Sequence, residues 1–226
     1  MQHEIREPSK LLDENGELVQ KGWARDLLLD YNREKIDAGW MRIKEWDYYA
    51  VLHPEYGITF TVADLGYSGL LAVVWLDFKE GTFIPDERMV WFTKGSFNLP
   101  KTSKEGDIHI NEKGIELSFI KEKTQRILNY NFPDFNNGEG IKAELVLEQD
   151  SSMDTMVIAT DWKENPTRFY YNQKINCMPS SGTVKKGDKT HEFKKEKCFG
   201  VLDWGRGVWT YKNRWYWGSA SGKLDD

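Results

Sequence analysis

Asp203 and Arg206 are the residues of this chain whose types and spacing most clearly suggest chemistry. They lie three positions apart in Asp203-Trp204-Gly205-Arg206-Gly207-Val208-Trp209. An aspartate among tryptophans could donate a proton, because burial favours its neutral form while a nearby guanidinium favours its charged form. Both are therefore candidate catalytic residues. The alternative, a fixed ion pair that holds a tight corner with the arginine stacked on an indole ring, is the commoner case.

Either interpretation needs Asp203 and Arg206 to meet. The glycines at 205 and 207 would let the chain turn so that Arg206 reaches back. We therefore predict an ion pair between Asp203 and Arg206, mostly buried beside Trp204 or Trp209.

Tryptophans surround this pair and continue beyond it, in Trp215-Tyr216-Trp217-Gly218. A buried tryptophan covers a large area and still needs a partner for its indole N–H. Such a set is either a difficult corner of the core or the lining of a site for a flat or apolar ligand. The candidate ligand-binding residues here are Trp204, Trp209, Trp215 and Trp217.

Three further residues are candidates for ligand contact. Asp64 and Tyr67 flank Gly66 where one expected strand turns into the next, and a carboxylate near a phenol could form an acid/base pair. The commoner role of such an aspartate is to accept backbone N–H bonds in the turn. Lys174 could anchor a ligand carboxylate or act as a base if buried, although most lysines lie at the surface.

Other classes of site lack support in the sequence. His3, His53, His109 and His191 are scattered, so we expect no metal. Cys177 and Cys198 form neither a disulfide framework nor a zinc motif. There is no Gly-x-Ser-x-Gly elbow and no phosphate-binding glycine loop, and we expect no cofactor. A net charge of -5 argues against nucleic acid as a partner. No segment has the length and apolarity of a membrane span, and we expect a cytoplasmic protein.

The elements that must position these residues are strands. Apolar and polar residues alternate over 58–62, 115–119 and 141–147, as in half-buried strands. Turn residues separate them at short intervals. This pattern predicts an all-β protein, either an antiparallel β-sandwich or a wide lipocalin-like barrel with an N-terminal arm. The segment 24–36 fits a helix or extended chain equally well.

We expect three parts along the chain. Residues 1–40 form an arm packed on the sheet, because Trp23, Leu27 and Tyr31 need burial. Residues 41–200 form the main β domain. Residues 201–226 form a Trp-rich strand that starts a second, truncated β unit. Residues 209–222 would lie at an open sheet edge or be poorly packed, and would favour self-association.

Several motifs resemble one bacterial family, the domain of unknown function 2804. They are Arg6-Glu7-Pro8 with Leu12-Asp13-Glu14-Asn15-Gly16, the stretch 62–69, the block 168–182, and above all the Trp-rich signature from 201 to 222. The resemblance covers nearly the whole chain and implies no particular activity. It also implies that members continue past residue 226. The β-rich pattern with its Trp/Asp/Gly cluster is more distantly similar to the lipocalin-like group of carotenoid hydratases and tocopherol cyclases.

Three functions remain open. The first is a binding module whose Trp-lined cavity holds an apolar or polyene-like small molecule. The second is an acid-catalysed hydratase, isomerase or cyclase of a lipophilic substrate, with Asp203 as proton donor. The third is a carbohydrate-binding sandwich, which would need Trp209, Trp215 and Trp217 exposed on one plane.

Overall fold

Antiparallel strands make up nearly all of the regular structure, which confirms the predicted all-β class. The computed structural model describes residues 3–214 and 216–223. The N-terminal strands are β1 (Ser9–Lys10), β2 (Gly22–Ala24) and β3 (Leu29–Asp30). The others are β4 (Ile43–Leu52), β5 (Tyr56–Asp64), β6 (Ser68–Asp77), β7 (Thr82–Trp91), β8 (Ile108–Glu112), β9 (Ile115–Lys121), β10 (Gln125–Phe132), β11 (Ile141–Glu148), β12 (Met156–Trp162), β13 (Asn165–Lys186), β14 (Lys189–Phe193) and β15 (Phe199–Val208).

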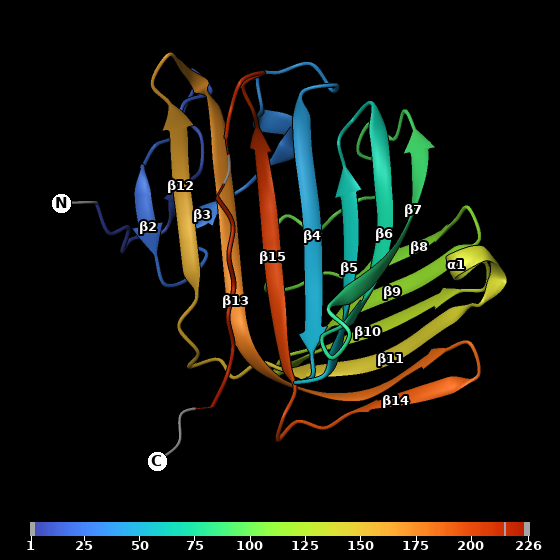
Figure 1. The fold of residues 1–226 in the computed structure, drawn as a ribbon. Helices are drawn as coiled ribbons and strands as arrows, with labels where there is room; N and C mark the ends of the chain where they lie inside the picture. Colours follow the sequence, from blue (N-terminus) through green and yellow to red (C-terminus); the bar gives the residue numbers. More distant parts are fainter. Residues whose placement is uncertain (1–2, 215, 224–226) are drawn as a thin grey trace.

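Ten of these strands form one nearly closed barrel, in the order β7-β6-β5-β4-β15-β13-β11-β10-β9-β8. The strands β7, β6, β5, β4 and β15 form one layer. The strands β11, β10, β9 and β8 cross behind it as a second layer (Figure 1). The long strand β13 belongs to both layers. Apolar side chains from alternate positions of the two layers fill the space between them.

The bend of β13 depends on two local irregularities. Its pairing with β15 shifts between Ile175 and Met178, and Cys177 there has a φ of 59°. Such a bulge bends a strand and increases its twist. Gly182 follows with a φ of 130°, and a Cβ there would lie 2.1 Å from the carbonyl oxygen of Glu144. Glycine at 182 therefore allows β11 to approach the bent strand closely.

The N-terminal segment lies against the barrel and is mostly extended. The strand β2 pairs with β12, and β1 pairs with β3. A short 3-10 helix, η1 (Arg33–Lys35), follows, and Leu27 and Tyr31 are buried. The only other helix in the described residues is α1 (Phe135–Gly138). Apart from η1, the segment 24–36 is thus extended, and it contains no α-helix.

The Trp-rich strand lies inside the sheet, between β4 and β13. The strand β15 pairs along its length with β4 on one side and with β13 on the other. Residues 201–208 therefore belong to the main sheet, and the expected second β unit does not begin there. Residues 209–214 and 216–223 contain no strand. They run back across the outer face of the sheet over β13 (Figure 1). The expected open strand edge at 209–222 is therefore absent from the described residues, because none of them forms a strand.

Candidate functional site

Asp203 and Arg206 lie on opposite faces of β15, so the predicted ion pair between them is wrong. The strand is continuous from 199 to 208, and side chains an odd number of positions apart point to opposite faces. The glycines do not turn the chain. A Cβ at Gly205 would lie 1.9 Å from the ring of Trp46, which packs flat on the bare backbone at this point.

Arg206 points into the barrel and is fully buried. Its Nη1 donates to Asp47 Oδ1 at 2.9 Å and to the carbonyl oxygens of Trp46 and Gly205, both at 2.8 Å. The guanidinium lies 4.4 Å from the ring centroid of Trp204. Burial raises the pKa of Asp47, and the Arg206 guanidinium acts in the opposite direction. Arg206 therefore neutralises a buried acid of β4 and has a structural role.

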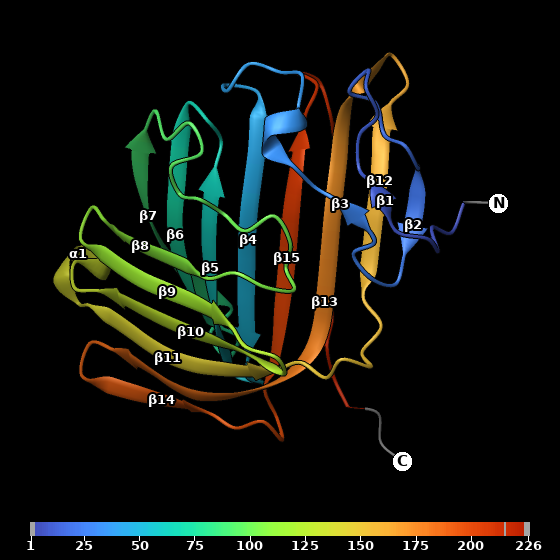
Figure 2. The same ribbon diagram turned by 180° about the vertical axis from the view of Figure 1, so that it is seen from behind.

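Two buried arginines also hold the segment between β7 and β8, which crosses the inner face of the first layer (Figure 2). Arg206 Nη2 donates to the Pro100 carbonyl oxygen at 2.7 Å, and Arg126 Nη2 donates to that of Ser103 at 2.6 Å. The void beside Asp47 and Arg126 measures only about 10 Å³. The barrel interior at this level is therefore filled by the chain itself.

Trp204 is part of this filled core. It is fully buried, and it meets Tyr31 and Tyr171 edge-on with ring centroids 6.4 and 5.6 Å apart. The predicted role of Trp204 as a cavity wall is not supported, because side chains occupy the space that a ligand would need.

Asp203 points to the outer face and accepts hydrogen bonds from four side chains. Its Oδ1 accepts from Trp46 Nε1 at 3.1 Å and from Asn172 Nδ2 at 2.6 Å. Its Oδ2 accepts from Trp217 Nε1 at 2.6 Å and from the ammonium of Lys174. An indole N–H and an ammonium group can only donate, so this arrangement requires an acceptor. The two Asp203 oxygens supply the acceptors at the centre of the cluster.

Aromatic rings surround this carboxylate. Trp46 stacks on Tyr170 with centroids 5.8 Å apart, and Trp209 meets Trp46 edge-on at 5.3 Å. Trp217 stands edge-on to Tyr48 at 5.7 Å. We call the following residues the Asp203 cluster: Trp46, Tyr48, Tyr170, Asn172, Lys174, Asp203, Trp209 and Trp217. The carbohydrate hypothesis needs exposed tryptophans on one plane; of its described members, Trp209 is only partly exposed and Trp217 is exposed.

The members of this cluster differ in burial. Asp203 is buried, and the side chain of Lys174 is only 13% exposed. Lys174 therefore does not lie at the surface, where most lysines are found. Burial, followed by the charge of Asp203, raises the pKa of the Tyr170 phenol. Trp217 is 52% exposed and comes from the segment without strands. The predicted ligand contact Trp215 lies outside the described residues.

Asp64 and Tyr67 do not form an acid/base pair. Asp64 is buried, and its oxygens accept from the backbone N–H groups of Gly66 and Gly95, each at 2.9 Å. It also accepts from the Thr93 hydroxyl at 2.9 Å. Tyr67 is exposed, with the ammonium of Lys44 4.5 Å from its ring centroid. Asp64 thus has the turn role that we considered the commoner one.

The partners of Asp203 that come from other strands were not predicted from the sequence. Trp46 and Tyr48 alternate with Asp47 in β4, so period two already places the two rings on one face and the acid on the other. What the pattern does not contain is the pairing of β4 and β13 with β15, which brings Trp46, Asn172 and Lys174 to Asp203.

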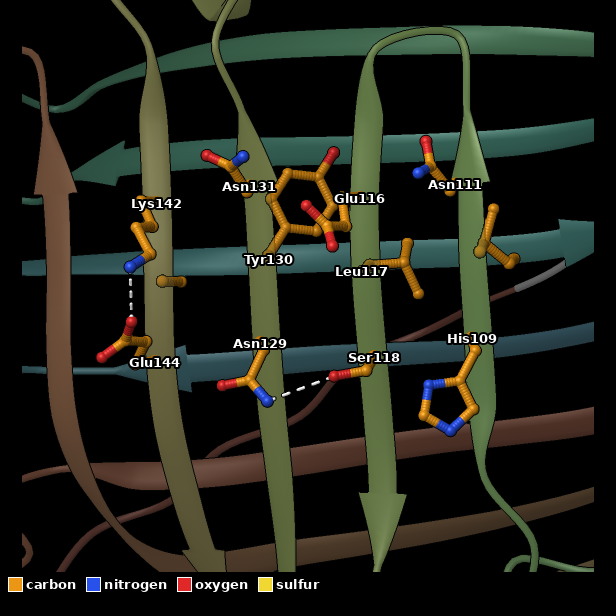
Figure 3. A pocket seen from close by; sticks show the side chains of 12 residues that line it. His109, Asn111, Glu116, Leu117, Ser118, Asn129, Tyr130, Asn131, Lys142 and Glu144 are labelled. Carbon is orange, nitrogen blue, oxygen red and sulfur yellow. Dashed lines mark hydrogen bonds and ion pairs between the residues drawn. The ribbon is translucent and has the colours of Figure 1, made fainter.

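Another hollow lies elsewhere on the described surface, over the outer face of β8 to β11. It measures about 820 Å³ and is open to solvent. Two rows of polar side chains cross these strands (Figure 3), with hydrogen bonds between Asn129 and Ser118 at 3.1 Å and between Lys142 and Glu144 at 2.6 Å. The side chains that point outward here are polar, so the hollow does not fit the predicted apolar ligand.

Among the described residues, His, Cys, Asp and Glu side chains form no group of three or more that could hold a metal ion. No helix of the described part of the chain is long and apolar enough to cross a membrane.

The fold and the site together define a nearly closed antiparallel β-barrel protein with an aromatic, aspartate-centred cluster on its outer face. Residues 2–226 match the family described as domain of unknown function DUF2804, and the chain belongs to that family. The family resemblance expected from the motifs is thereby confirmed. Comparison with curated proteins finds no match.

A solved structure with a similar fold is that of a "putative AttH" from Nitrosomonas europaea. The TM-score is 0.54 at 12% sequence identity, and the match covers 81% of this chain. It covers 57% of the other chain, so the present chain spans a little over half of that protein's length. At this identity the likeness concerns the fold alone.

Proposed function

We propose that this protein binds a flat, apolar small molecule that carries one hydrogen-bond donor, and that the ligand takes the place of the Trp217 ring in the Asp203 cluster. The observation that supports this is the composition of the donor set around Asp203. Three donors come from the sheet itself, whereas the fourth, Trp217 Nε1, comes from a segment without strands.

Withdrawal of Trp217 would leave Asp203 Oδ2 with one free acceptor position. Lys174 would still neutralise the carboxylate, so the anion would remain stable in the sheet. A hydroxyl group of a ligand could then donate to Oδ2 as the indole does. Pockets for small molecules commonly combine apolar walls with one or two such placed polar groups.

The position of the Trp217 ring also matches a flat conjugated ligand. The ring lies edge-on to Tyr48, and the ammonium of Lys174 is 5.6 Å from its centroid. Any π-system in this position would have the same aromatic and cationic neighbours. A hollow of about 390 Å³ adjoins Lys174 and is lined in part by Met153 and Met156. Methionine side chains adapt to irregular apolar shapes, so this hollow suits an apolar tail.

Binding fits this geometry better than acid catalysis by Asp203. A proton donor needs a protonated carboxyl group, and protonation would remove an acceptor that four N–H groups share. The hydratase, isomerase or cyclase alternative would need another acid.

Retinol and its methyl ether provide a test, because they share one polyene and differ only in the hydroxyl donor. We expect retinol to bind about tenfold or more tightly than the ether, as for a hydrogen bond to a charged acceptor. Trp217→Ala should tighten retinol binding, since no ring has to be displaced. Fluorescence titration measures both affinities.

Trp91→Ala is the matched control, since Trp91 is another exposed indole and lies on β7, outside the Asp203 cluster. It should bind retinol as the unaltered protein does. Equal affinity for the two polyenes, or an equal response of the two tryptophan variants, would contradict the proposal.

A further inference from the structure

A second group of aromatic side chains lies exposed at one end of the barrel. The start of β4, the turn between β5 and β6, and the end of β7 meet there (Figure 1). We call its exposed apolar members the aromatic rim: Trp40, Met41, Tyr67, Trp91 and Phe92. Single exposed apolar residues are ordinary, but a contiguous group of this kind marks an interaction surface.

The backbone holds these residues together. Gly66 has a φ of 82°, and a Cβ there would lie 2.0 Å from the carbonyl oxygen of Trp40, so the turn packs directly on that residue. The backbone N–H of Phe92 donates to the Tyr67 carbonyl oxygen at 2.8 Å. The ring centroids of Trp40 and Phe92 are 6.5 Å apart in an edge-on contact.

Phe92 adopts a conformation that a phenylalanine rarely takes. Its φ is 58°, and that of Lys94 is 53°, in the left-handed region where a Cβ is unfavourable. The two turn hydrogen bonds, Phe92 N–H to Tyr67 and Lys94 N–H to the Gly66 carbonyl oxygen at 3.0 Å, maintain it. Phe92 is nonetheless 65% exposed, so core packing does not account for this backbone conformation. Strained residues of this kind cluster at functional sites.

The charges beside the aromatic rim are positive, although the chain as a whole carries -5. The ammonium of Lys94 lies 5.0 Å from the ring centroid of Trp40, and that of Lys44 lies 4.5 Å from that of Tyr67. Arg42 follows Met41 directly in the chain. The neighbouring acid, Asp64, is buried and already bonded to Gly66, Thr93 and Gly95, so it does not offset these cations at the surface.

We propose that the aromatic rim docks on the surface of an anionic lipid bilayer. Tryptophan, tyrosine and phenylalanine side chains partition into the interface between headgroups and acyl chains, and lysines beside them attract anionic headgroups. An acidic protein would meet such a bilayer with this end, because Lys94 and Lys44 lie here beside exposed apolar side chains. The proposal is independent of the ligand site at Asp203, which belongs to the outer face of β15, β4 and β13.

Sedimentation of the protein with vesicles tests this directly. We compare vesicles of phosphatidylcholine alone with vesicles that also contain phosphatidylglycerol. Binding should require phosphatidylglycerol and should weaken at high salt. Phe92→Gly should lower the partition coefficient about tenfold, as expected when one aromatic side chain no longer inserts. Lys94→Gln should lower it about fivefold, the effect of one cation near an anionic surface.

Phe83→Ala is the matched control, because Phe83 lies on the same strand as Trp91 and is 66% exposed, but at the other end of β7. Its partition coefficient should not change. The absence of binding to either vesicle, or an equal loss in Phe83→Ala and Phe92→Gly, would overturn the proposal. Sedimentation velocity without lipid gives a further check. A dimer that Phe92→Gly abolishes would show that the aromatic rim contacts a second copy of the chain instead.

Discussion

Replacement of Arg206 by methionine provides the sharpest test of the role of Arg206 as the buried partner of Asp47. The change keeps an apolar chain of similar length but removes the only cation that hydrogen-bonds to Asp47 among the described contacts. It also leaves the carbonyl oxygens of Trp46, Gly205 and Pro100 without this donor. Loss of one partner of a buried ion pair costs about 3–5 kcal/mol, and we expect Arg206→Met to lower the free energy of unfolding by that amount.

The pH dependence of this loss identifies Asp47 as its cause. Burial raises the pKa of Asp47 in the folded protein. At pH values just above the ordinary aspartate pKa, the folded state therefore binds more protons than the unfolded chain. The contribution of Asp47 to stability therefore falls as the pH rises through that range. Arg206 lowers this pKa, so without Arg206 the fall in stability continues to higher pH. The loss in Arg206→Met should be larger near neutral pH than in mild acid.

The assay is urea unfolding of Arg206→Met, Asp47→Asn and the double variant. In the Arg206→Met background, Asp47→Asn should restore about 1–3 kcal/mol, because it removes the unpaired charge. Arg88→Met removes the partly exposed partner of Asp86 and should cost about 1 kcal/mol or less. A fully stable Arg206→Met protein, or a double variant no more stable than Arg206→Met, would refute the assignment.

Three further predictions concern single positions. Gly205→Ala should lower the free energy of unfolding by about 1–3 kcal/mol and alter the near-UV circular dichroism, because its Cβ would collide with the Trp46 ring, whereas Gly218→Ala, with open space around it, should do neither. Phe92→Gly should raise the melting temperature, because it relieves a left-handed backbone conformation that costs about 1 kcal/mol. A lower melting temperature would contradict this strain. Lys44 has its pKa lowered to about 8 by burial, so the folded protein binds fewer protons than the unfolded chain and stability should rise as the pH increases from about 8 towards the ordinary lysine value of 10.5. Urea unfolding over that range should show a smaller rise for Lys44→Met.

Much of the fold follows from local pattern. Alternation at Ile58, Phe60 and Val62, and again at Ile115, Leu117 and Phe119, predicts half-buried strands, and all of these residues are buried in the barrel. Turn chemistry separates the strands, and the Trp-rich motif identifies the family. These signals are local because side-chain period and turn preference depend on residues a few positions apart.

The sequence could also have predicted which side chains lie on each face of this strand, but we expected the glycines to break the strand. Treated as regular, a strand over 199–208 places Asp203 and Arg206 on opposite faces and excludes their ion pair. The importance of the Trp-rich segment could therefore be inferred from residue types, whereas the roles of its two charges could not be assigned under that expectation.

The partners of those charges were decided by the tertiary structure alone. Asp47 and Trp46 reach β15 from a strand about 160 positions earlier in the chain, and Lys174 reaches it from β13. Pairing between strands so distant depends on how all ten barrel strands share one core, and no local pattern encodes that arrangement. The sequence by itself determined strands, turns and an aromatic segment that had to be covered. Closure of the barrel determined that Arg206 neutralises an acid inside it, while Asp203 gathers its donors on the outer face.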